Sequence, residues 1–162
     1  MFRLSASARA ALVLALTVFL PVLAGAGCKR EIGDECTTAA DCNPNGTRSC
    51  DNTQPGGYCT IQGCDETSCP SEAACMRYFP AQFLTQACDT QAPVSGCAAD
   101  EICLDGGLCA PLSTEVRYCV KTCSSNNDCR SDYECRLAGT RGSMMLTANP
   151  NAIVHFCAPA TQ

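Results

Sequence analysis

The apolar residues of this chain form one long N-terminal run and, after it, only short stretches separated by polar residues. Between residues 10 and 26 no residue is charged, and Ala, Leu and Val dominate. Beyond that run the densest apolar stretches are 76–84 and 141–156. Gly-Gly, Asn-Gly and Asn-Pro-Asn sequences, which are typical of turns, punctuate the rest. The pattern predicts short β-hairpins rather than long strands or long helices.

The clearest predicted hairpin covers residues 143–157. Its first strand is expected at 143–147, its turn at 149–151, and its second strand at 152–157, which holds Ile153, Val154 and Phe156. Helix is expected for no more than a turn or two, at 81–87.

The N-terminal run is predicted to be a signal peptide of residues 1–27. Arg3 and Arg9 give it a basic start, and Pro21 with the small residues that follow makes it short for a membrane-spanning helix. An uncleaved membrane anchor is the alternative. The small residues end at Cys28, which resembles the lipobox of bacterial lipoproteins, although Gly25 stands where that motif usually has Leu. A competing A-x-A cleavage site lies at 24–26.

The cysteine count favours lipidation of Cys28. The chain contains 17 cysteines, and an exported protein with an odd number leaves one for another use. Acylation of Cys28 would anchor the protein in a lipid bilayer, with residues 28–35 as the tether. The next residue is Lys29, not the Asp that retains lipoproteins of enteric bacteria in the inner membrane, so the outer membrane is the expected location. The other 16 cysteines are predicted to form disulfides of unknown pairing: Cys36, Cys42, Cys50, Cys59, Cys64, Cys69, Cys75, Cys88, Cys97, Cys103, Cys109, Cys119, Cys123, Cys129, Cys135 and Cys157.

The composition after residue 27 predicts a small disulfide-rich fold with a minimal hydrophobic core. Only 17 of these 135 residues are Leu, Ile, Val or Phe, as many as are Cys. Covalent staples replace apolar burial in such chains, and they require an oxidising compartment outside the cytoplasm. Two of the 11 Lys and Arg residues lie in the leader, so the rest of the chain has nine basic residues and all 16 Asp and Glu residues. This acidic balance argues against a nucleic-acid partner.

The cysteine spacing indicates an internal duplication. The first eight cysteines after Cys28 and the second eight follow similar series of gaps, and the last gap is the longest in both. The sequence therefore predicts two tandem eight-cysteine modules, at 36–88 and 97–157, joined by a linker at 89–96 and followed by a tail at 158–162. Each half can also be divided into two four-cysteine units. The pairing inside a module stays open, because eight cysteines allow 105 connectivities.

Several local motifs resemble those of known proteins. Gly33-Asp34-Glu35-Cys36, Gly56-Gly57-Tyr58-Cys59 and the run from Cys123 to Cys135 resemble the cysteine-rich lipoproteins of myxobacteria. The spacing, with Asp41 and Asp128 each before a cysteine, is also similar to Dickkopf-type N-terminal cysteine-rich modules. The resemblance implies a disulfide-rich architecture and identifies no ligand or reaction.

No sequence motif predicts catalysis, a metal or a cofactor. The chain has no C-x-x-C pair, and its one histidine, His155, is expected to be an ordinary strand residue. The Asn, Asp and Glu residues at 126–128 and at Asp65, Glu66 and Glu72 are expected to be ordinary turn or surface residues. A calcium site with oxygen ligands from either group is the alternative. We therefore expect a protein that is not an enzyme.

The two densest apolar stretches after the leader are candidates for a partner surface. They contain Tyr78, Phe79, Phe83, Met144 and Met145, which are residue types common at interfaces. The alternative is that they form the small core of each module. The expected function is a membrane-anchored extracytoplasmic module that binds an unknown protein or envelope partner. A structural or protective envelope component is the alternative, and a redox or hydrolytic enzyme is a remote one.

Overall fold

The structure is a computed structural model, and it describes residues 30–43, 45–92, 96–147, 149 and 152–160. The predicted signal peptide, Cys28 and part of the predicted linker and tail lie outside the described residues. Short strands dominate the described part. The elements are α1 (Ala39–Cys42), β1 (Ser49–Cys50), β2 (Cys59–Thr60), β3 (Ala73–Tyr78), η2 (Ala81–Phe83), β4 (Glu101–Cys103), β5 (Cys109–Pro111), η3 (Leu112–Thr114), β6 (Val116–Lys121), η4 (Asn126–Asp128), β7 (Tyr133–Leu137), β8 (Ser143–Met145) and β9 (His155–Pro159).

Eight disulfides join all 16 cysteines of the described part. The bonds define four units of four cysteines, and in every unit the first cysteine bonds the third and the second bonds the fourth. Unit 1 contains Cys36, Cys42, Cys50 and Cys59; unit 2 contains Cys64, Cys69, Cys75 and Cys119; unit 3 contains Cys88, Cys97, Cys103 and Cys109; unit 4 contains Cys123, Cys129, Cys135 and Cys157.

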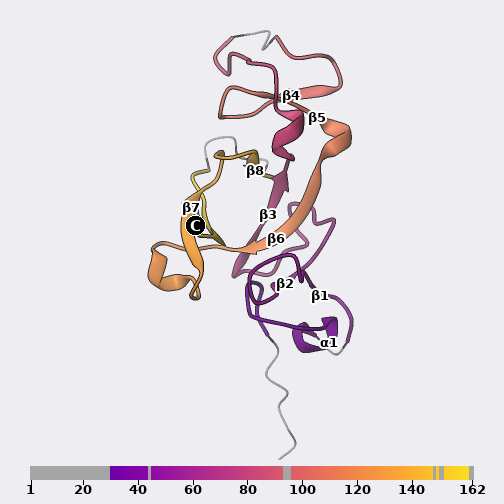
Figure 1. The fold of residues 1–162 in the computed structure, drawn as a ribbon, viewed down its shortest axis with the longest axis vertical. Coiled ribbons are helices and arrows are strands. Elements are labelled where there is room, and N and C mark those ends of the chain that lie inside the picture. The colour runs from indigo at the N-terminus through magenta and orange to yellow at the C-terminus, as the bar shows by residue number, and fades with distance from the viewer. Residues whose placement is uncertain (1–29, 44, 93–95, 148, 150–151, 161–162) are drawn as a thin grey trace, which may run out of the picture.

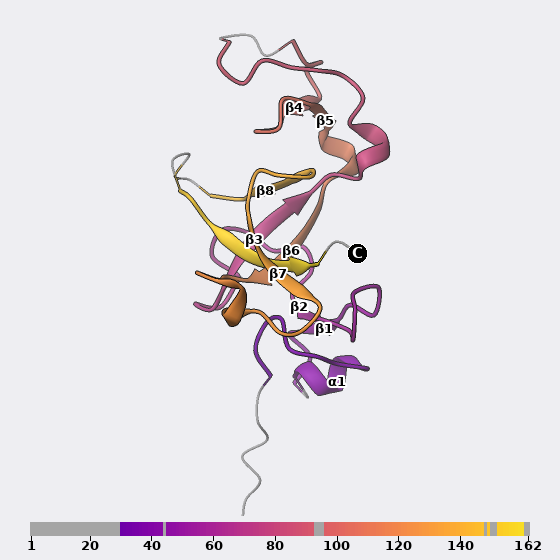
Figure 2. The ribbon, with the colours of Figure 1, turned by 60° about the vertical axis from the view of Figure 1, so that its left-hand side comes forward.

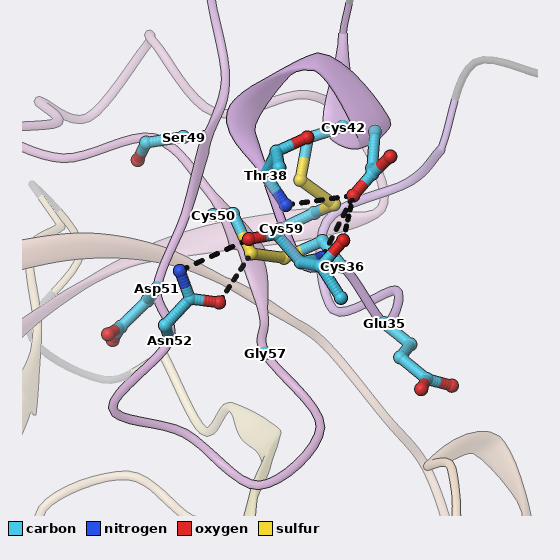
Figure 3. The surroundings of a disulfide bond; sticks show 12 residues. Glu35, Cys36, Thr38, Cys42, Ser49, Cys50, Asp51, Asn52, Gly57 and Cys59 are labelled. Atoms are coloured by element: carbon cyan, nitrogen blue, oxygen red, sulfur yellow. Dashed lines mark hydrogen bonds between the residues drawn. A yellow bond between two sulfur atoms is a disulfide. The ribbon is translucent and has the colours of Figure 1, made fainter.

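Each unit has the same local structure. The third and fourth cysteines lie directly opposite each other on two antiparallel strands, and each is bonded back to the loop that precedes the first strand. Figure 3 shows the two neighbouring disulfides of unit 1, with Gly57 in the loop that leads to Cys59. A unit is therefore an antiparallel pair of strands tied twice to the segment that precedes it. The two strands follow each other directly in units 1 and 3, whereas other strands lie between them in units 2 and 4. The predicted small disulfide-rich fold of short β-hairpins is confirmed.

Unit 3 is inserted between the third and fourth cysteines of unit 2. The Cys69–Cys119 bond spans 50 residues, and Cys88 bonds Cys103. Both bonds cross the predicted linker at 89–96, so the division into modules 36–88 and 97–157 is corrected. Gap lengths record the order of cysteines but not their partners, and this is why the spacing suggested a boundary that the chain does not have.

The second predicted feature to be corrected is the hairpin at 143–157. Strand β8 pairs with β3, so that Met145 lies opposite Met76, whereas β9 pairs with β7, so that Cys157 lies opposite Cys135. Alternation of apolar and polar residues identifies a strand but does not identify its partner. The helix expected at 81–87 is a single 3-10 turn, η2.

The strands arrange the four units along one axis. Unit 1, with α1, β1 and β2, lies at one end, and unit 3, with β4 and β5, lies at the other (Figures 1 and 2). The sheet β6-β3-β8 and the antiparallel strand pair β7-β9 lie between them. Among the described residues, eight of the 19 buried apolar side chains are cysteines, as expected for a core in which disulfides take the place of large apolar side chains. No helix in the described ranges has the length and apolarity needed to cross a membrane.

Candidate functional site

Units 1, 2 and 4 meet around a cavity of about 310 Å³. All four tyrosines of the chain, Tyr58, Tyr78, Tyr118 and Tyr133, line it together with Phe156. The strands β3, β6 and β7, which carry three of these tyrosines, lie between the two ends of the molecule in both views (Figures 1 and 2). No described residue of unit 3 lines this cavity.

The repeated disulfide pattern places three of these rings. The residue immediately before the fourth cysteine is Tyr58 in unit 1, Tyr118 in unit 2 and Phe156 in unit 4. Successive residues of a strand point to opposite faces, so a cysteine that turns toward its disulfide leaves the residue before it on the other face. In unit 3 the same position is Leu108, which does not line the cavity.

The wall formed by units 1 and 4 is a stacked pair of rings beside an arginine. The rings of Tyr58 and Tyr133 lie 5.5 Å apart at an interplanar angle of 30°. The guanidinium of Arg130 lies 4.4 Å from the Tyr133 centroid and 5.7 Å from that of Tyr58. It donates hydrogen bonds to the Tyr133 hydroxyl and to the carbonyls of Pro55 and Gly57. Arg130 therefore holds the loop of unit 1 against unit 4.

The loop that carries Tyr58 depends on a glycine. Gly57 has a φ of +68°, and a Cβ at this position would overlap the carbonyl oxygen of Cys36. Only glycine meets both conditions, because it has no Cβ and adopts positive φ without strain. The loop then turns the Tyr58 hydroxyl toward the backbone N–H of Lys121, which donates to it at 3.0 Å.

The opposite wall comes from the sheet of unit 2. The ring centroid of Tyr78 lies 6.2 Å from that of Tyr118, with an interplanar angle of 58°. It lies 6.2 Å from the ring centroid of Phe156, in an edge-to-face arrangement. Met76 and Val120 lie beneath these rings and are buried. These residues share one face because they alternate along β3 and β6, in a register that pairs Met76 with Tyr118.

Burial favours the protonated form of three phenols of the cavity, those of Tyr58, Tyr78 and Tyr133. Burial raises the pKa of Tyr58 to about 12, against the opposing effect of its bond from Lys121. Burial also raises the pKa of Tyr78 and that of Tyr133. Neutral phenols act as hydrogen-bond donors and acceptors and not as bases, so the arrangement suits binding better than proton transfer.

Several polar groups on the lining already have partners. Arg136 donates to Glu134 at 2.6 Å and to the carbonyl of Pro159 at 2.9 Å. Asp51 accepts from the backbone N–H and the hydroxyl of Thr53. Four other groups make no hydrogen bond to any described residue: the hydroxyls of Tyr78 and Tyr118, the side-chain amide of Gln54 and the guanidinium of Arg141. These four groups are free to meet a ligand.

The residues predicted as a partner surface are divided by the structure. Phe79 is 3% exposed and belongs to a small core with Leu104 and Ala110, so its assignment to a surface is wrong. Met144 packs against that core. Met145 and Tyr78 pack against another, around Phe156, and Tyr78 also lines the cavity. Phe83 alone is exposed, at 44%. The two stretches supposed to serve separate modules meet in one sheet, through the pairing of β3 with β8.

The other candidates for chemistry have local partners. Asp128 accepts from the backbone N–H groups of Ser124 and Ser125, and Asp65 accepts from that of Thr67. These bonds lower the pKa of both carboxyl groups. His155 lies exposed on β9 and does not line the tyrosine cavity. The cysteine clusters whose sulfurs lie near one another are disulfide-bonded, so they offer no thiolate to a metal.

Sequence reasoning missed most of the cavity. Tyr58, Tyr118 and Tyr133 were not among the predicted site residues, and Arg141 was included only as the first residue of the candidate stretch 141–156. The sequence nevertheless has a tyrosine before a cysteine at Tyr58-Cys59 and again at Tyr118-Cys119. The available signal was therefore a repeated aromatic residue before the fourth cysteine.

Known protein families, curated proteins and solved structures were compared with the chain, and none matches it. No activity is therefore transferred from a relative.

Proposed function

We propose that this protein is an exported lipoprotein, anchored to a membrane through Cys28, that acts as a binding module. The observation that carries the proposal is the complete pairing of the other cysteines. Sixteen of the 17 form eight disulfides, so Cys28 is the one cysteine left for a modification. Disulfides persist in oxidising compartments, which supports export.

The start of the described chain supports a short tether. Ile32 is fully buried, and the N–H of Gly33 donates to the carbonyl of Cys59 at 2.9 Å. Only residues 29–31 separate Cys28 from Ile32, and four residue steps span at most about 14 Å. A lipid on Cys28 would thus hold unit 1 close to the head groups of the outer membrane.

The cavity supports binding over a purely structural role and over catalysis. A structural void is best filled by apolar contacts, whereas this cavity has four polar groups without a partner among the described residues. The single histidine does not line the cavity, and burial favours the neutral phenols of Tyr58, Tyr78 and Tyr133 over the ionised ones. Ligand sites typically combine aromatic walls with a few polar groups of this kind.

The proposal is tested by the intact mass of protein extracted from membranes with detergent, before and after reduction and alkylation. We expect a chain that begins at Cys28, carries acyl groups, and alkylates at cysteines only after reduction. Cys28→Ser is expected to release the protein from the membrane without changing the eight disulfides. A chain that begins at Gly27 with an unmodified Cys28 would contradict the anchor, and thiols that alkylate without reduction would contradict the complete pairing.

A further inference from the structure

We propose that the tyrosine cavity binds a carbohydrate ring that carries a single carboxylate, with Arg141 as the residue that selects the charge. The inference rests on the proposed binding function and deepens it by naming the ligand class. It is argued from the free groups of the lining, from the turn that holds Arg141 and from the size of the cavity.

The unpartnered groups match a ligand rich in hydroxyls. The Tyr78 and Tyr118 hydroxyls and the Gln54 amide can each donate and accept hydrogen bonds. Sugar hydroxyls have the same dual capacity, so they can satisfy these groups in several orientations. The aromatic walls supply flat apolar surfaces for the C–H face of a sugar ring. A hydrocarbon ligand would instead leave the polar groups without partners, at a cost in affinity.

The charge of the lining favours one negative charge on the ligand. Arg136 is paired with Glu134, whereas Asp51 keeps its negative charge and accepts hydrogen bonds from the N–H and the hydroxyl of Thr53. Arg141 has no ion pair or hydrogen bond from its side chain to any described residue. A planar guanidinium binds a carboxylate through two parallel hydrogen bonds. The guanidinium of Arg141 can therefore bind one carboxylate, whereas the negative charge of Asp51 on the same lining disfavours a doubly charged phosphate.

The backbone at Arg141 supports a role for its side chain. Arg141 has a φ of +51° and Gly142 one of +72°, and the N–H of Ser143 donates to the carbonyl of Thr140 across them. The first central position of such a turn favours Asn, Asp or Gly and not a long side chain. The turn is fixed to β3, because the N–H of Phe79 donates to the carbonyl of Gly142 at 2.8 Å. An arginine is thus held at the cavity in a conformation it adopts uncommonly.

The size of the cavity limits the ligand. At about 310 Å³ it lies at the lower end of the range for ligand pockets. It therefore suits one or two sugar rings, such as the end of a glycan, and not a long polymer.

The test is a titration of the full mature protein with D-glucuronate, followed by tyrosine fluorescence. The chain has no tryptophan and all four tyrosines line the cavity, so the signal reports on this site. We expect saturable binding of glucuronate, with glucose about tenfold weaker because one charge-assisted interaction is lost. Glucose 6-phosphate is expected to bind more weakly than glucuronate.

The decisive variant is Arg141→Asn, because asparagine suits the left-handed turn and preserves the fold. It is expected to reduce glucuronate affinity about tenfold and to leave glucose affinity unchanged. Arg117→Asn, at an exposed arginine outside the cavity, is the matched control and should behave as wild type. An absence of saturable glucuronate binding, tighter binding of the phosphate, or equal affinity in wild type and Arg141→Asn would each overturn the inference. The acylation of Cys28 is tested separately by intact mass, so its outcome does not depend on the outcome of the titration.

Discussion

Unit 3 and the three units around the cavity share one disulfide pattern but differ in what they present. In all four units the third and fourth cysteines lie opposite each other on two antiparallel strands. Units 1, 2 and 4 place an aromatic ring before the fourth cysteine, whereas unit 3 has Leu108 there and lies at one end of the molecule. The comparison teaches that the same disulfide pattern fixes the backbone of every unit, whereas the place of a unit in the fold and its residue before the fourth cysteine decide what it presents to the cavity.

The largest expected effect separates the long staple of unit 2 from a short staple of unit 3. Replacing Cys69 and Cys119 together with Ala opens a loop of 50 residues and should lower the free energy of unfolding by about 4 kcal/mol. Replacing Cys97 and Cys109 opens a loop of 12 residues and should cost about 3 kcal/mol. Denaturation in guanidinium measures both. Only the first pair should change the tyrosine fluorescence of the native state, and equal changes would contradict the separation of unit 3 from the cavity.

Gly57→Ala should destabilise the protein by about 3 kcal/mol, because the new methyl group overlaps the Cys36 carbonyl and the φ is left-handed. Gly63→Ala is the matched control. Its φ of +69° is nearly the same, but nothing lies within 4 Å of its Cβ position. The control should therefore cost only about 1 kcal/mol. Thermal unfolding of the two variants measures the difference, and equal losses would show that the close contact with Cys36 is unimportant.

Phe156→Leu gives unit 4 the type of side chain that unit 3 has before its fourth cysteine. Phe156 is 1% exposed and packs edge-to-face on Tyr78, so the substitution should cost about 1.5 kcal/mol and enlarge the cavity. Leu108→Ile, in unit 3, should leave the fluorescence of the four tyrosines unchanged. A fluorescence change in the Leu108 variant equal to that of Phe156→Leu would break the comparison between the two units.

The smallest expected effect is a pH dependence that units 1 and 4 share. Asp41 accepts from the N–H groups of Thr37 and Thr38, and Asp128 does the same for Ser124 and Ser125. These bonds lower the pKa of both carboxyl groups from the ordinary value of 3.8. Their stabilising contribution is therefore complete above that value, and it is lost as the pH falls below it toward the folded pKa. Asp128→Asn should flatten the loss of stability in acid, whereas Asp105→Asn, at a carboxyl group that accepts no hydrogen bond from a described residue, should not.

The sequence predicted the class of fold because composition and turn chemistry act locally. Many cysteines, few aliphatic residues and frequent Gly and Asn turns require short stapled hairpins whatever the partners are. The disulfide pairing could not be predicted from the sequence, because the similar gaps between cysteines fit many connectivities. The prediction of a partner surface was wrong at Phe79 for a related reason. In a small protein, the sequence around an aromatic residue does not show whether its side chain fills a core or contacts a partner.

By itself, then, the sequence determined the stapled hairpins, the odd cysteine at position 28 and the acidic charge balance. Tertiary structure alone decided that unit 3 interrupts unit 2 and that β8 and β9 pair with different strands. It also decided that four tyrosines far apart in the chain enclose one cavity. The physical reason is that turns, caps and alternation depend on neighbours in sequence. The cavity depends on which strands pair across long separations, and that choice is fixed by the closure of the disulfides together.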